Sequence, residues 1–422
     1  MKKQDNERKN ISSNDMYKAM FNDFFSHIGS FGDEDADILW LVFEDCLRNG
    51  QYEVCSELLR MFNPIEPRNI VLKKVLQAKL CIETGELNRA EKYLREASHI
   101  GGGKNFEALR MQGYTLHLLG LVLAEKGDTK QALNTLRRAI RLYDQAIRQS
   151  RKRDIVSLRN KGLVLRDLGE ILAESGRYRE ALRALSSSVR IYNEVLRFMG
   201  ERDLTILNDK ANSLRLLGEA LSELGDEEGA IENIASAIHI HEKVLKKCRD
   251  LDPTTWYYRG LAYQSLGEIF IRQGDFANAL GAFSEAVSSF RMSIKSAHGA
   301  NPNAWHSLGL VFQSLGEIAM SRSKKFALGF MVLALVAYRK ALMEQNYRSG
   351  ATLFNMGLAL SDIGTLLYDM DASSSEKAFC LAIKYMKEAL DKSPEIFQDY
   401  IRKTIIELLD FVSTTGFSCE EY

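Results

Sequence analysis

The sequence is poor in proline, and its apolar runs are short. Five prolines occur in 422 residues, and few segments alternate polar and apolar residues with the period of a strand. We therefore expect the chain to be nearly all helix. The longest apolar run, FALGFMVLALVAY at 326–338, is shorter than the ~20 residues that a membrane-spanning helix needs. No membrane partner is expected.

The sequence also lacks an excess of positive or negative charge, and it lacks closely spaced pairs of cysteines. Lys and Arg total 56, as do Asp and Glu, so composition gives no support for a nucleic-acid partner. The six cysteines include no Cys-x-x-Cys pair, which argues against a disulfide framework or a structural zinc site. The stretch MKKQDNERKNISSNDM has neither the apolar core of a signal peptide nor the composition of a transit peptide. These absences predict a cytoplasmic protein, with the nucleus left open.

What the sequence does contain is a repeat. RDLGEILAESGRYREAL (166–182) returns 49 residues later as RLLGEALSELGDEEGAI, and then again as QSLGEIFIRQGDFANAL. One glycine column therefore recurs every 49 residues, and a second column follows seven residues after it. The first column contains Gly120, Gly169, Gly218, Gly267 and Gly316, and the second contains Gly127, Gly176, Gly225 and Gly274.

The columns predict pairs of helices. The second glycine predicts the end of a first helix, because glycine adopts the left-handed conformation of a C-terminal cap at least cost. Beyond it, two small residues flank a large apolar one, as expected where helices pack closely. A column of strong N-cap residues predicts where each first helix begins. This column contains Asn105, Asp154, Asp203, Asp252, Asn301 and Ser349.

This arrangement closely resembles the tetratricopeptide repeat family. Leu168, Gly169, Gly176, Ala181 and Leu185 match the family's Leu-Gly, turn-glycine, small and apolar positions. The family's usual unit has about 34 residues, so the units here are lengthened. Their second helices carry an additional column of Tyr143, Tyr192, His241, Phe290 and Tyr338. The resemblance implies an all-α, right-handed superhelical solenoid of about eight helix-turn-helix repeats.

The repeats also predict how the chain is divided. The expected segments are a flexible tail at 1–35, two short repeats at 36–103, six lengthened repeats at 104–391, a capping helix at 392–413 and a tail at 414–422. A closing helix is expected because an array must cover its last apolar face. Within the first tail, 16–28 is predicted to form a helix that caps the first repeat or, alternatively, a detachable segment that occupies the binding groove.

The resemblance implies a non-enzymatic interaction scaffold or adaptor. Proteins of this family bind extended peptides or helices along a concave wall made by their first helices. The groove-facing positions carried over to this chain are His117, Arg166, Glu170, Arg215, Glu219, Gln264, Glu268, Gln313 and Glu317. Their glutamates would receive basic or amide groups of a partner. Alternatively, Arg166–Glu170 and Arg215–Glu219 are only structural i,i+4 ion pairs.

A second candidate surface lies in the seventh repeat. Val332, Leu333 and Val336 stand where the sixth repeat has Ser284, Glu285 and Ser288. If these apolar side chains face solvent, they mark an interface for self-association or for another protein. Alternatively, a shorter turn rotates this helix, or neighbouring helices cover the three side chains.

No pattern predicts a catalytic, cofactor-binding or metal-binding residue. HIGGGKN at 99–105 resembles a phosphate-binding loop, but no strand precedes it and Asn105 replaces the required Ser or Thr. Two alternatives to the scaffold remain. An RNA-binding helical repeat would need a basic, aromatic groove, and a peptide-sensing regulator would use the same groove as the scaffold.

Overall fold

The computed structural model describes residues 31–48, 50–100, 105–150, 154–200, 203–345, 348–417 and 419. Within these ranges the chain is helical, and its only extended pairing is an isolated bridge between Phe31 and Phe62. The predicted all-α repeat architecture is confirmed. The segment 16–28, predicted as a cap or groove ligand, lies outside the described residues.

The chain divides into two compact units, Met1–Val164 and Leu165–Tyr422, and the division falls within helix α8 (Ile155–Glu174). The helices of the first unit are η1 (Asp33–Asp35), α2 (Ala36–Arg48), α3 (Tyr52–Met61), α4 (Pro67–Glu83), α5 (Leu87–His99), α6 (Phe106–Glu125), α7 (Thr129–Gln149) and the first part of α8. Those of the second unit are the rest of α8, α9 (Tyr178–Met199), α10 (Leu204–Glu223), α11 (Glu227–Lys247), α12 (Pro253–Arg272), α13 (Phe276–Ser296), α14 (Pro302–Met320), α15 (Lys324–Glu344), α16 (Gly350–Leu367), α17 (Ala372–Lys392) and α18 (Glu395–Thr415).

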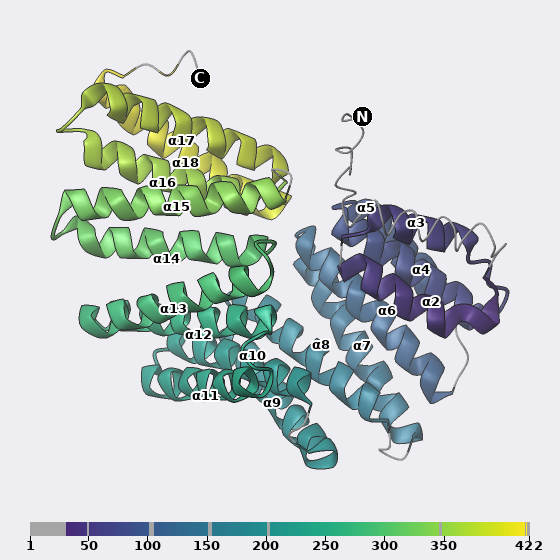
Figure 1. Ribbon diagram of the computed structural model, residues 1–422. Coiled ribbons are helices and arrows are strands. Elements are labelled where there is room, and N and C mark those ends of the chain that lie inside the picture. Colours follow the sequence, from purple (N-terminus) through teal and green to yellow (C-terminus); the bar gives the residue numbers. More distant parts are fainter. Residues whose placement is uncertain are drawn as a thin grey trace, which may run out of the picture. The chain divides into compact units, whose positions relative to one another are not determined.

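Helices α2 to α17 alternate as the first and second members of eight pairs, and α18 follows them. In the second unit, α14 to α18 lie side by side, each in contact with the next (Figure 1). Helix α18 buries Ile401, Ile405 and Leu408 against this stack, while Asp399 and Lys403 face solvent. An apolar inner face and a charged outer face are what a closing helix requires.

The predicted N-cap column is confirmed. All six side chains accept hydrogen bonds from backbone N–H groups in the first turn of the helix that follows. Pro253 and Pro302 occupy the first helical position, where a missing N–H costs nothing.

The two glycine columns are required for different reasons. The turn glycines have positive φ, for example 70° at Gly176 and 84° at Gly225. The Leu-Gly glycines instead lie within first helices, against the large apolar residue of the second helix. A Cβ atom at Gly169 would lie 2.5 Å from Cγ of Leu185, so this column permits close helix packing.

The lengthened part of each pair uses the same small-against-large contact a second time. A Cβ atom at Gly113 would lie 3.0 Å from the Tyr143 ring, and one at Gly309 would lie 2.4 Å from the Tyr338 ring. Glycines two turns before the Leu-Gly glycines thus face the additional aromatic column. The sequence pattern revealed the aromatic residues but not these opposing glycines.

His241 occupies this aromatic column as a buried, neutral side chain. Its Nδ1 lies 3.1 Å from Oδ1 of Asn208, and its ring stacks on Tyr258 with centroids 6.1 Å apart. Burial, reinforced by the charges of Arg215 and Arg259, lowers the pKa of His241 to about 3. The ring therefore stays uncharged at neutral pH, which suits its place among Tyr and Phe residues.

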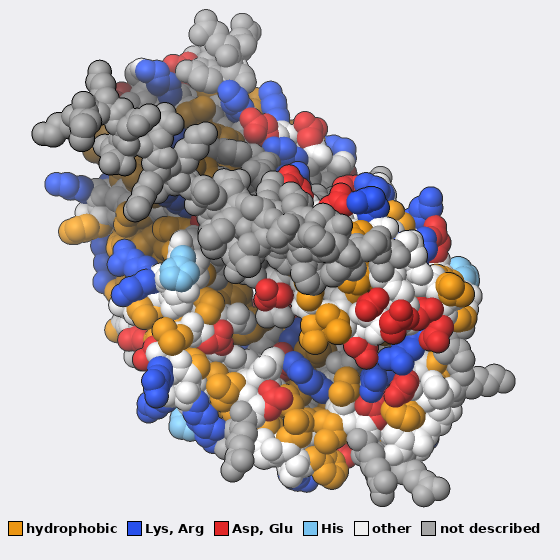
Figure 2. Space-filling model, turned by 45° about the vertical axis from the view of Figure 1, so that its right-hand side comes forward, with side chains coloured by type: hydrophobic (Ala, Val, Ile, Leu, Met, Phe, Trp, Pro, Cys, Tyr) orange, Lys and Arg blue, Asp and Glu red, His pale blue; other side chains and the backbone are white. Residues whose placement is uncertain are grey.

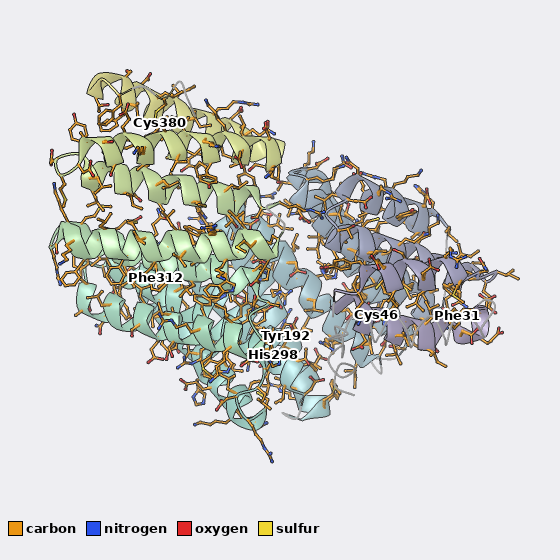
Figure 3. All side chains as sticks on the ribbon, turned by 45° about the horizontal axis from the view of Figure 1, so that its top comes forward. Phe31, Cys46, Tyr192, His298, Phe312 and Cys380 are labelled. Carbon is orange, nitrogen blue, oxygen red and sulfur yellow. A yellow bond between two sulfur atoms is a disulfide. The ribbon has the colours of Figure 1, made fainter. Side chains whose placement is uncertain are left out.

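The expectation that the cysteines form no disulfide was wrong for one pair. Cys380 of α17 is bonded to Cys419, which follows the end of α18 (Figure 3). Between them, Gly416 adopts a left-handed conformation, and the Phe417 ring lies 5.9 Å from that of Tyr368 and 6.4 Å from that of Phe379. Cysteines so far apart in sequence become partners only because α18 folds back along α17.

Helix α15 is, among the described helices, the one long and apolar enough to cross a membrane by length and composition. An 18-residue window within its 21 residues has a mean hydropathy of 1.7, and 39% of this window is buried within the protein. A single such helix is weak evidence for membrane insertion, because core helices meet the same criterion. In this structure Ala327, Met331 and Ala334 of α15 are fully buried in the repeat stack.

Candidate interaction surfaces

The predicted groove residues lie on first helices, but not all are available to a partner. His117, on α6 of the first unit, is only 7% exposed. The other eight belong to the second unit, where they follow one another on α8, α10, α12 and α14. Among these, Arg215 is buried, while Glu268 and Glu317 are exposed.

Arg166 does not form the predicted i,i+4 pair with Glu170. Its Nη2 lies 2.7 Å from the Asp167 carboxylate, and its Nη1 lies 3.4 Å from Asp209 of the next first helix, α10. Glu170 is left half-buried near this group. Packing brought Asp209 within reach of Arg166, which a pattern along one helix does not indicate.

Arg215 does form the predicted pair with Glu219. Its Nε also donates to Oδ1 of Asn212 at 3.0 Å, and the Ser265 hydroxyl of α12 donates to the same Glu219 carboxylate. For this pair the structural alternative holds, because the buried guanidinium needs these partners. Glu219 is thus already engaged within the protein.

Three further carboxylates lie on the first helices that follow α10: Glu268 on α12, Glu317 on α14 and Asp362 on α16. Together with the carboxylates on α8 and α10, they form what we call the acidic row. Gln264 donates to Glu268 at 3.0 Å, and Gln313 donates to Asp362 at 3.3 Å. The sequence pattern missed Asp362, because it lies three positions before Thr365, the equivalent of Glu317 in its repeat. The carboxylates of this row are Asp167, Glu170, Asp209, Glu219, Glu268, Glu317 and Asp362, and its buried or half-buried cations are Arg166 and Arg215.

The surroundings disfavour the charged form of several carboxylates in this row. Burial raises the pKa values of Glu170, Glu268 and Glu317. Burial and then the charge of Glu317 raise the pKa of Asp362 to about 6. Although Glu268 and Glu317 reach solvent, the flanking helices limit the hydration of their charges. A cation from outside the chain would relieve this cost.

Replacing Asp362 with Asn is therefore expected to stabilise the second unit at pH 7.5. Because the folded-state pKa is raised, the folded carboxyl holds its proton more tightly than the unfolded one. The contribution of the Asp362 carboxyl to the free energy of unfolding is thus fully present below pH 4 and is lost as the pH rises through about 6. The loss is about 1–2 kcal/mol, after allowance for the partial exposure of this side chain.

Urea denaturation at pH 4 and pH 7.5 measures this effect. The gain from Asp362→Asn should appear at pH 7.5 and vanish at pH 4. Asp391→Asn, at an exposed site on α17, is the matched control and should change neither value. Destabilisation by Asp362→Asn at pH 7.5 would contradict the assignment.

The first unit contains a hollow that the sequence pattern did not indicate. Its volume is about 530 Å³, and its walls come from first helices α2, α4 and α6 and the first part of α8. The lining residues are Asp37, Trp40, Arg68, Asn69, Leu72, Glu107, Arg110, Met111, Tyr114, Val156, Arg159 and Asn160. The Trp40 and Tyr114 rings meet edge to face at 6.0 Å, and Arg110 lies 3.2 Å from Asp154. No single repeat carries this set of residues, so a column pattern could not have marked it.

The apolar residues of α15 lie at the surface. Val332, Leu333 and Val336 are 47%, 43% and 52% exposed, whereas Ala337 is buried. Met331 and Ala334 remain in the core, so α15 keeps the orientation of the other second helices. Elsewhere, cationic and anionic side chains are interspersed on the face displayed in Figure 2, in keeping with the balanced composition.

A family model described as tetratricopeptide repeat matches residues 114–145, which cover parts of α6 and α7. The same two glycine columns recur in the pairs α8/α9, α10/α11 and α12/α13. Residues 114–145 are therefore a tetratricopeptide repeat. No curated protein sequence matches the chain significantly.

Within the described ranges, no group of three or more His, Cys, Asp or Glu residues could hold a metal ion.

Three solved structures are similar to this chain, each at less than 25% identity. The S. pombe nuclear import adaptor Nro1 is 13% identical with a TM-score of 0.44, covering 72% of this chain and 99% of Nro1. A tetratricopeptide repeat protein from Parabacteroides merdae is 14% identical with a TM-score of 0.37, covering 80% and 98%. A Rap protein, solved in complex with competence and sporulation factor, is 12% identical with a TM-score of 0.46, covering 90% and 99%.

Proposed function

We propose that this tetratricopeptide repeat protein is a non-enzymatic scaffold or adaptor, and that the first helices of its second unit bind a basic peptide or helix of a partner protein. The observation that carries the proposal is the acidic row on α8, α10, α12, α14 and α16. Its carboxylates outnumber the arginines among them, and two of the carboxylates, Glu268 and Glu317, reach solvent.

The partial burial of the carboxylates in the acidic row favours a cationic ligand. The raised pKa values of Glu268 and Glu317 mean that their charged forms lack full solvation. A Lys or Arg of a partner would supply a charge-assisted hydrogen bond to each carboxylate. Because these helices are already packed, the protein itself loses little conformational entropy on binding.

The spacing of the row limits what the partner looks like. Packed helix axes lie about 10 Å apart, so Glu268 and Glu317 present charges at about that interval. An extended peptide in the polyproline II conformation covers this distance in about three residues, which is one turn, and a helix covers it in about seven. We therefore expect Lys or Arg at every third residue of an extended ligand, or at every seventh residue of a helical one.

A charge-reversal variant tests this proposal. Glu268→Lys combined with Glu317→Lys should weaken binding of a labelled extended peptide with Lys at every third position at least tenfold. Glu232→Lys combined with Asp391→Lys makes the same change in net charge on exposed positions of second helices and should weaken it less than threefold. Fluorescence anisotropy at low and high salt measures both. Equal losses in the two variants, or no binding by the unaltered protein, would show that the row is not the site.

The RNA-binding alternative is opposed by the same carboxylates, because phosphates and glutamates repel each other. Retention of single-stranded RNA in a mobility-shift assay at physiological salt would overturn our preference. A peptide-sensing regulator would share the row, and a large thermal shift caused by short peptides alone would identify that role.

We also propose that the protein acts in the cytoplasm. Four described cysteines, Cys46, Cys55, Cys81 and Cys248, are free thiols, whereas the Cys380–Cys419 bond is of the kind more common in oxidising compartments. Imaging of a fluorescent fusion tests the location, and nuclear or extracellular signal would refute it.

The proposal includes a second contact surface on α15. The sequence predicted either a second copy of this chain or another protein as the occupant of Val332, Leu333 and Val336. Charges around these residues distinguish the two occupants, as argued next.

A further inference from the structure

Helix α15 has an exposed face whose centre is apolar and whose ends are basic. Val332, Leu333 and Val336 form the centre, each about half exposed. Lys325 lies exposed in the first turn, and Arg339 and Lys340 lie exposed near the other end. The only acidic residue of α15 is Glu344. We refer to the following six residues as the α15 face, which does not include Glu344: Lys325, Val332, Leu333, Val336, Arg339 and Lys340.

The cations at the start of α15 do not stabilise the helix. Lysines in a first turn are disfavoured by the helix dipole, which prefers acidic residues there. Lys324 is offset by Asp369 at 3.0 Å, but Lys325 points to solvent. The corresponding helices α11 and α13 have Asp226, Glu227 and Asp275 near their starts and follow the usual preference. A partner with acidic groups accounts for the different arrangement on α15.

A second copy of this chain is a poor occupant of this face. In a parallel pairing of two α15 helices, each cationic end meets the same cationic end. In an antiparallel pairing, Lys325 of one copy meets the end that holds Arg339 and Lys340 of the other. Like charges placed opposite each other weaken both arrangements.

An anionic membrane fits less well than a peptide. The three central side chains are only about half exposed, so they cannot insert deeply between lipids. A peptide can instead fit its own side chains against the partly covered ones.

We propose that the α15 face binds a helical segment of a partner protein that has an apolar centre and acidic residues at both ends. From Lys325 to Lys340 the helix rises about 22 Å, so the acidic groups should be about 15 residues apart in a helical ligand. Apolar residues at helical spacing in its middle would cover Val332, Leu333 and Val336. This proposal does not depend on the acidic row, because the two surfaces use different helices and opposite charges.

A variant that copies the neighbouring repeat tests the apolar centre. Val332→Ser, Leu333→Glu and Val336→Ser together give α15 the residues that α13 carries at the same positions, where the helix packs normally. This variant should keep its circular dichroism and melting temperature. It should lose at least tenfold in affinity for a helical peptide with leucines in its centre and glutamates about 15 residues apart at its two ends.

A second variant tests the basic ends. Arg339→Glu with Lys340→Glu should weaken the same peptide about tenfold and reduce the salt dependence of binding. A matched peptide with Gln in place of Glu should bind the unaltered protein about as weakly as the Glu peptide binds this variant. Affinity that is unchanged in both variants, or absent in the unaltered protein, overturns the proposal. A concentration-dependent dimer abolished by the triple substitution would identify a second copy instead, and binding to phosphatidylserine vesicles but not to the peptide would identify a membrane.

Discussion

Gly309→Ala is expected to destabilise the second unit by about 2–3 kcal/mol, the cost of forcing extra atoms into a packed core. The new Cβ atom would lie 2.4 Å from Cε1 of Tyr338, whose ring is fully buried. The ring cannot move aside freely, because its hydroxyl donates to Gln313 at 3.1 Å and Gln313 donates to Asp362. Urea denaturation followed by the fluorescence of Trp305, on the same helix, measures the change.

Gly329→Ala is the matched control for this substitution. Gly329 also lies within a helix, but apart from its chain neighbours and the adjacent backbone of that helix, no atom lies within 4 Å of the position that its Cβ would occupy. Alanine should therefore stabilise the protein by about 0.5–1 kcal/mol through its higher helix propensity. Opposite signs at the two positions would establish that the glycines facing the aromatic column serve packing. A stabilising effect at both would show that the Gly309–Tyr338 contact is not close.

Loss of the Cys380–Cys419 disulfide is expected to have the second large effect. The bond links residues 39 apart, and a loop of that size contributes about 3–4 kcal/mol by restricting the unfolded chain. Cys419→Ser should remove this contribution and release Phe417 from Phe379 and Tyr368. Hydrogen exchange should then increase in α18 before it increases in α14 or α15, because α18 is held from one side only.

Two controls make this prediction decisive. A reductant should destabilise the unaltered protein as much as Cys419→Ser does, and should leave that variant unchanged. Cys248→Ser, at a free cysteine, should have little effect. Titration of the denatured, unreduced protein should find four reactive thiols, and six would mean that the bond does not form.

Much of this fold could be predicted because each repeat contains the same residues that begin, end and pack its two helices. An N-cap residue, a turn glycine and a small–large–small series act within one helix pair, and their recurrence every 49 residues separates them from chance. The all-α class and the N-cap positions followed from these rules. The same reasoning placed the apolar residues of α15 on a solvent-facing side, because helical periodicity assigns faces reliably.

The candidate surfaces were predicted less well, since they depend on contacts between repeats. Arg166 pairs with Asp209 of the next first helix, and Asp362 joins the acidic row from a position outside the column. The hollow beside Trp40 and Tyr114 draws residues from four helices. Cys419 reaches Cys380 only because α18 turns back at Gly416.

The sequence by itself determined the helix pairs, their boundaries and which residues face their cores, because these follow from interactions between residues near one another in the chain. Only the tertiary structure decided which charges are already neutralised, which carboxylates are held in poorly hydrated positions and which cysteines meet. Those outcomes depend on side chains brought together from separate helices, and their distances and burial are not encoded in the spacing of any one segment.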